Sequence, residues 1–94
     1  NQQKYAESVQ YFTKSIQLNP SYFNAYTNLA RAYFFSGQYA AAIQTITKEM
    51  EMDKQQSIKD IPYIALSYQK MGNMAEAKKW EAISKTYYSN FKLE

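Results

Sequence analysis

The carboxylates of Glu49, Glu51 and Asp53 form the densest group of potential metal ligands in the chain. Hard cations such as Ca²⁺ bind where several carboxylate oxygens converge on one point. Near the end of a helix, side chains at this spacing diverge around the axis, so they do not surround a common ion. The pattern therefore predicts a solvated helix end and no metal site.

Other side chains that carry chemistry are missing or isolated. The chain has no histidine and no cysteine, which excludes histidine bases, thiol nucleophiles, disulfides and zinc sites built on those residues. It contains no glycine-rich phosphate-binding loop. Trp80 and the ten tyrosines stand at helical spacing, which is typical of core packing rather than of a cofactor site. We therefore expect no enzyme activity and no cofactor.

Charge and hydropathy limit the classes of partner. Eleven basic residues against eight acidic ones give a net charge of +3, and the lysines are scattered along the chain. Nucleic-acid binding needs a basic stripe or patch, so we expect none. No run of 18 apolar residues is present, so we expect no membrane insertion. The sequence assigns no cellular compartment.

The elements that would position any binding residue are indicated by composition and by internal repeats. Only two glycines and two prolines in 94 residues argue against a turn-rich β fold and favour one all-α domain. Sliding the chain against itself by 34 or 35 residues aligns aromatic, small and glycine positions, which is typical of a repeat protein. The matched pairs include Tyr5 with Tyr39, Val9 with Ile43, Phe12 with Ile46, Ala30 with Ala65, Tyr33 with Tyr68, and Gly37 with Gly72.

Each repeat unit has the pattern of two helices. In the central unit, Ser21 is expected to cap a helix over about residues 22–36, which Gly37 ends in the left-handed conformation. A second helix is expected over about residues 38–52. Because the connection is short, the two helices must lie antiparallel, with Ala30 and Ala42 where their backbones approach closely.

The run from Ala25 to Tyr33, together with Gly37-Gln38-Tyr39 and Ala42-Ile43, resembles the tetratricopeptide repeat, as does the closing Leu18-Asn19-Pro20. The resemblance implies an antiparallel helix-pair superhelix, a solenoid of about five helices. It divides residues 1–94 into the second half of a repeat (1–22), a full repeat (23–57) and a terminal capping repeat (58–94).

Three positions depart from the family pattern. Glu49 stands where the family usually has a small alanine, and Lys54 replaces the closing proline. An extra residue also enters the linker at 53–58. Ser57 and Asp60 could form a capping box, or Asp60 could cap a helix that begins at Ile61; Pro62 in the first turn favours the second arrangement.

The resemblance also implies that the first helix of each repeat lines a concave face that binds proteins or peptides. Phe34 and Phe35 are adjacent on one helix, so both cannot point into the core, and an exposed ring near Arg31 favours an acidic partner peptide. Alternatively, both rings pack against the next repeat. Asn28 and Lys59 match two positions of a family clamp for a C-terminal carboxylate, but other clamp positions differ. The predicted peptide-binding residues are Asn24, Thr27, Asn28, Arg31, Phe34, Phe35, Lys59, Tyr63, Leu66 and Lys70.

Function and the two ends of the chain follow from this interpretation. The favoured function is a protein–protein interaction module; the alternatives are a self-associating spacer and a regulatory appendage of an enzyme outside these residues. The first helix should lack its upstream partner, so it either frays, forms a homodimer, or is sealed by Tyr5 and Tyr11. The last helix should present a polar outer face of Lys78, Glu81 and Lys85, with its apolar stripe reaching Phe91.

Overall fold

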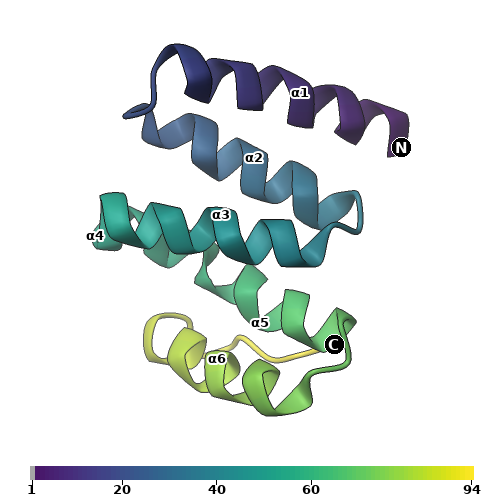
Figure 1. The fold of residues 1–94 in the computed structure, drawn as a ribbon. Helices are drawn as coiled ribbons and strands as arrows, with labels where there is room; N and C mark the ends of the chain where they lie inside the picture. Colours follow the sequence, from purple (N-terminus) through teal and green to yellow (C-terminus); the bar gives the residue numbers. More distant parts are fainter. Residues whose placement is uncertain (1) are drawn as a thin grey trace.

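Consecutive antiparallel helices stack in chain order in the computed structural model, which describes residues 2–94 (Figure 1). A short connection joins each helix to the next, and both termini lie on the same side of the stack. The main helices are α1 (Gln2–Leu18), α2 (Phe23–Phe35), α3 (Tyr39–Met52), α5 (Ile61–Lys70) and α6 (Met74–Tyr87), with the short α4 (Lys54–Ser57) and the 3-10 turn η1 (Ile58–Asp60) between α3 and α5. The predicted all-α stack of helix pairs is confirmed.

The two glycines end equivalent helices in equivalent ways. Gly37 and Gly72 both have φ of +83°, in the left-handed region that other residues adopt only with strain. The amide of Gly37 donates to Phe34 O and that of Gln38 to Tyr33 O, which is the pairing of a Schellman motif. The start of α2 differs from expectation, because Ser21 Oγ donates to Asn19 Oδ1 and makes no cap bond.

Small residues bring the helices together around a narrow core. Ala30 of α2 and Ala42 of α3 are fully buried, as expected for close backbone approach. Ile46 and Ile64 fill the centre between α3 and α5, and Trp80 of α6 packs against them. Because both isoleucines belong to one cluster that α2, α3, α5 and α6 share, the core is continuous along the stack.

Helix α5 begins at the predicted residue, but the predicted capping interaction is not formed. Helix α5 begins at Ile61 with Pro62 in its first turn, where no intrahelical amide bond is lost. Asp60 makes no side-chain cap bond to this helix. Its carboxylate turns toward α2, so the capping role predicted for Asp60 is wrong.

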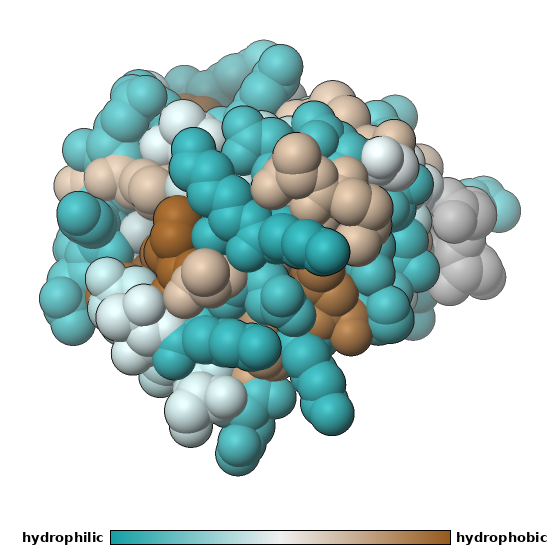
Figure 2. Space-filling view, turned by 90° about the horizontal axis from the view of Figure 1, so that it is seen from below, coloured by the Kyte–Doolittle hydropathy of each residue, from teal (hydrophilic) through white to brown (hydrophobic). Residues whose placement is uncertain are grey.

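The last helix ends earlier than the apolar pattern suggests. Helix α6 stops at Tyr87, and residues 88–94 turn back and run beside α5 and α6 (Figure 1). Lys78 and Lys85 are exposed, whereas Glu81 is half-buried under this returning segment. The face seen from the α6 side is largely hydrophilic, and its hydrophobic areas are small (Figure 2). Within residues 2–94, no helix has the length and apolar character needed to cross a membrane.

Candidate protein-binding surface

The two adjacent phenylalanines at the end of α2 have different surroundings. Phe34 lies between Tyr39 of α3 and Tyr63 of α5, with ring centroids 5.5 and 5.0 Å away. Both contacts are edge-to-face, an arrangement that aromatic pairs favour. Phe34 therefore packs α2 against both α3 and α5, which agrees with the alternative interpretation that this ring packs against the following helices.

Phe35 instead keeps much of its ring in solvent. Its side chain is 46% exposed. Tyr5 of α1 stacks on it at 5.8 Å with an interplanar angle of 25°, and Tyr63 meets it edge-on at 6.0 Å. Rings from α1 and α5 thus hold Phe35 in place and leave one side open. We use the name Phe35 surface for Phe35, Tyr5 and Tyr63 together with the exposed amides of Asn24 and Asn28.

Arg31 is paired within the protein and is not free to meet a partner's carboxylate. Its Nε and Nη2 both donate to Oδ1 of Asp60, at 3.2 and 3.0 Å. The Asp60 side chain is fully buried, whereas that of Arg31 is 40% exposed. The guanidinium also lies 5.7 Å from the centroid of the Tyr63 ring. Arg31 therefore ties α2 to the start of α5, and its charge is neutralised locally.

Thr27 is not on the concave surface, because a buried partner draws it inward. Its hydroxyl donates to Oε1 of Glu49 at 2.8 Å, and both residues are buried. The prediction that Thr27 lines a peptide groove is therefore wrong. The cause is Glu49 itself, which takes a position that usually holds alanine and needs a hydrogen-bond donor there.

Glu49 is held as the protonated acid. Burial first, and then the hydrogen bond and the charge of the neighbouring Asp60, raise the pKa of Glu49 from 4.5 to about 9, although Thr27 and Lys59 act to lower it. Oε2 of Glu49 and Oδ2 of Asp60 are buried and receive no hydrogen bond from any donor in residues 2–94. A proton on Glu49 supplies the donor that these two oxygens otherwise lack.

The other acidic residues near the end of α3 point to separate places. Glu51 approaches Lys48 at 4.0 Å on the surface. Asp53 accepts hydrogen bonds from the backbone and side chain of Gln56, which lower the pKa of its carboxyl. Across residues 2–94, no three such groups gather as metal ligands. Glu51 and Asp53 have the solvated environment expected, but Glu49 does not.

A match to a known family fits this geometry. Residues 11–44, from the second half of α1 to the first turns of α3, match the family model for the tetratricopeptide repeat. The match is confined to this stretch, which is similar to a tetratricopeptide repeat. No curated protein and no solved structure matched the chain. Such repeats are generally protein–protein interaction modules and typically non-catalytic.

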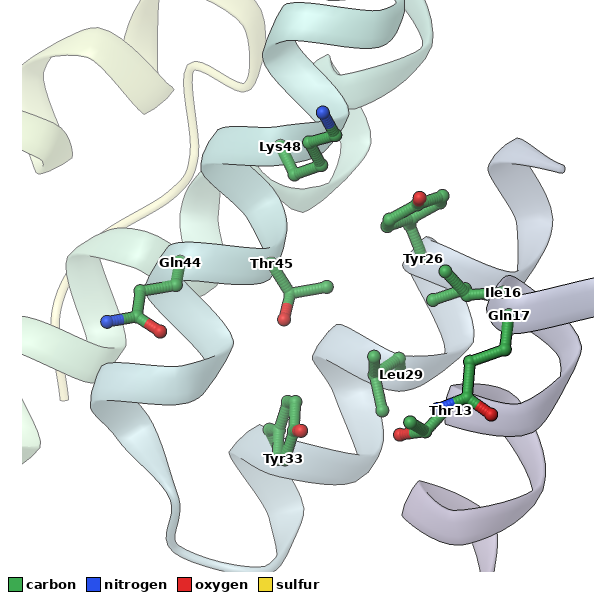
Figure 3. A pocket seen from close by; sticks show the side chains of 9 residues that line it. All are labelled: Thr13, Ile16, Gln17, Tyr26, Leu29, Tyr33, Gln44, Thr45 and Lys48. Carbon is green, nitrogen blue, oxygen red and sulfur yellow. The ribbon is translucent and has the colours of Figure 1, made fainter. Parts of the chain in front are cut away.

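A cleft lies on the side of α2 opposite Phe35. It has a volume of about 300 Å³ and lies over α2 between α1 and α3 (Figure 3). Its floor is apolar and its rim is polar, with Lys48 and Gln17 at the edge. The lining residues are Thr13, Ile16, Gln17, Tyr26, Leu29, Tyr33, Gln44, Thr45 and Lys48.

The remaining predicted residues spread along α2 and α5. Lys59 is exposed, with its Nζ 5.6 Å from the centroid of the Phe23 ring. Leu66 is half-buried, and Lys70 pairs with Glu94 at 2.8 Å. The structure thus places both Arg31 and Phe35 against the ring of Tyr63, whereas Lys70 pairs with Glu94.

Sequence reasoning did not assign Tyr5 and Asp60 to this region. For Asp60 a signal was available, since a glutamate in a small-residue position needs a polar partner across the junction. Tyr5 was predicted as a repeat position and as a seal over its neighbouring helix, and its ring stacks on one side of Phe35. Tyr11, the other residue proposed for that seal, is 68% exposed.

Proposed function

We propose that the Phe35 surface binds a peptide or an amphipathic helix of a partner protein. The observation that carries the proposal is the ring of Phe35, held by Tyr5 and Tyr63 yet 46% exposed. A rigid aromatic side chain with one open side contributes contact area at little cost in conformational entropy. Its preferred contact is an apolar or aromatic side chain of the partner.

Charge makes a smaller contribution to this binding than the sequence suggests. Arg31 and Lys70 are neutralised by Asp60 and Glu94, whereas Lys59 remains exposed beside Phe23. Asn24 and Asn28 lie one turn apart on α2 and are both exposed, so their amides can pair with a partner's backbone. We therefore expect a partner with an apolar anchor and polar flanks, and only a weak preference for acidic residues.

The test uses a peptide selected from a random library against the immobilised chain. Phe35→Ala should weaken its binding about tenfold or more, because truncating a central aromatic anchor typically costs about 2 kcal/mol. Tyr11→Ala is the matched control, since this exposed aromatic lies on α1 outside the Phe35 surface. Equal affinities of the wild type and Phe35→Ala for the selected peptide would refute the proposal. Arg31→Glu is unsuitable as a probe, because it places a second carboxylate beside buried Asp60.

Self-association through α1 is the second candidate, favoured by Tyr11 and Leu18. These side chains are 68% and 79% exposed. Light scattering over a range of concentrations distinguishes the two candidates. A dimer that dissociates in Tyr11→Lys with Leu18→Lys supports self-association, whereas a monomer at all concentrations leaves the Phe35 surface as the sole proposal.

A further inference from the structure

The segment after α6 lies on the protein in the manner of a bound peptide. From Phe91 to Glu94 the side chains alternate, with Phe91 and Leu93 half-buried and Lys92 and Glu94 exposed. A period of two is that of an extended strand with one face against a surface. Phe91 follows a turn closed by its amide donating to Tyr88 O at 2.9 Å, so the chain reverses before this segment begins.

The backbone of this segment is anchored by side chains of two helices. Gln69 of α5 makes two bonds to Glu94: its Nε2 donates to the carbonyl oxygen at 2.8 Å, and its Oε1 accepts from the amide at 3.1 Å. Oε2 of Glu81 of α6 accepts from the Leu93 amide at 3.0 Å. These three bonds go to main-chain atoms, so they fix an extended peptide whatever its side chains.

One further contact selects a side chain. Nζ of Lys70 lies 2.8 Å from Oε1 of Glu94, and this partner raises the pKa of the lysine. Both groups are well exposed, so the pair adds little to stability. It does favour an acidic residue at this position over a basic one. The Lys70–Glu94 pair and the half-buried Phe91 and Leu93 together define a short sequence pattern. It consists of an apolar residue, any residue, a second apolar residue and an acidic residue.

We propose that Gln69, Lys70 and Glu81 form a second peptide-binding site, the tail site, whose ligand is an extended segment of a partner with this pattern. Residues 91–94 occupy the tail site within the same molecule and compete with that partner. The segment is held mainly by exposed hydrogen bonds and two half-buried side chains, so it opens more easily than the helices do. The tail site lies on α5 and α6 and does not include Phe35, so it is independent of the surface proposed above.

The test is binding of a labelled, C-terminally amidated peptide, Ser-Asn-Phe-Lys-Leu-Glu, to the full chain. In the wild type the tail competes for the site, so binding should be weak. Phe91→Ser with Leu93→Ser releases the tail and should raise the affinity at least tenfold. Adding Gln69→Leu to the released chain should remove that gain, because the paired bonds to the peptide backbone are lost. Helical circular dichroism confirms that each variant is folded.

Two further arms decide between this site and simpler explanations. Lys70→Glu in the released chain should weaken this peptide and strengthen one in which lysine replaces the final glutamate. Phe35→Ala should leave both affinities unchanged, which separates this proposal from that for the Phe35 surface. Glu94→Lys alters no helix residue but weakens the hold of Lys70 on the competing segment. The affinity of the chain for the labelled peptide should therefore rise about threefold over wild type. Equal binding by the wild-type and released chains, or no effect of Gln69→Leu, would overturn the tail site.

Discussion

Replacing Glu49 with glutamine tests the buried carboxyl pair directly. Glutamine has nearly the same shape, can accept the hydrogen bond from Thr27, and can donate an amide hydrogen to Asp60. It differs from glutamic acid in having no proton to lose. The substitution therefore preserves the packing of the α3–α5 junction and removes only the titration of this site.

The magnitude follows from the raised pKa of Glu49. This pKa is about 9 in the folded protein and near 4.5 in the unfolded chain. Between these values the folded state keeps a proton that the unfolded state has released, so the free energy of unfolding falls as pH rises. The stabilisation is fully present below about pH 4.5, falls by about 1.4 kcal/mol per pH unit, and is lost by about pH 9. From about pH 6 to about pH 8 the loss is on the order of 3 kcal/mol, a large part of a small domain's stability.

The assay is urea unfolding, followed by helical circular dichroism at several pH values and constant ionic strength. Wild type should lose on the order of 3 kcal/mol more than Glu49→Gln over that interval, since their other titrating groups are shared. Glu51→Gln is the matched control: it lies on the same helix but is exposed, and it should follow the wild type. Parallel pH dependences for wild type and Glu49→Gln would refute a proton held on Glu49.

Three further predictions concern stability and can be measured by the same unfolding assay. Arg31→Ala leaves Asp60 buried without its cation and should destabilise the protein by about 3 kcal/mol, whereas replacing both residues by apolar ones should cost less. Gly37→Ala should cost about 1–2 kcal/mol from its positive φ alone, since nothing lies within 4 Å of an added Cβ; a smaller loss would show that the turn relaxes. Asn73→Ala removes the cap that accepts from the Glu76 amide and should cost about 1 kcal/mol, with Asn73→Asp close to wild type.

Most of the fold could be predicted because its signals are local. Gly37 and Gly72 fix the helix ends through a backbone conformation that depends on one residue each. The 35-residue spacing between them predicts the repeat before any contact is known. The end of α6 was predicted less well, because Phe91 continues the apolar stripe in sequence although its contacts are made from an extended segment.

The binding surfaces were harder to predict, because their contacts join residues far apart in the chain. Phe35 was identified from one adjacent pair, since two neighbours on a helix cannot share one direction. The burial of Thr27 depends on Glu49, 22 residues later, and the pairing of Arg31 depends on Asp60, 29 residues later. Helical spacing alone places Thr27 and Arg31 on an open face, and only the partners supplied by α3 and η1 change that.

The buried network also means that the repeats are not interchangeable parts. At the junction of α1 with α2, Ser15 takes the position that Glu49 has in the next unit, and Ala25 takes that of Asp60. A duplicated copy of residues 23–57 would place its Arg31 and Glu49 against Ala25, with no carboxylate to meet either group. An array lengthened by copying its central unit would therefore lack the carboxylate of Asp60 at the new junction. Grafting residues 49–60 as one block would keep Glu49 and Asp60 together at that junction.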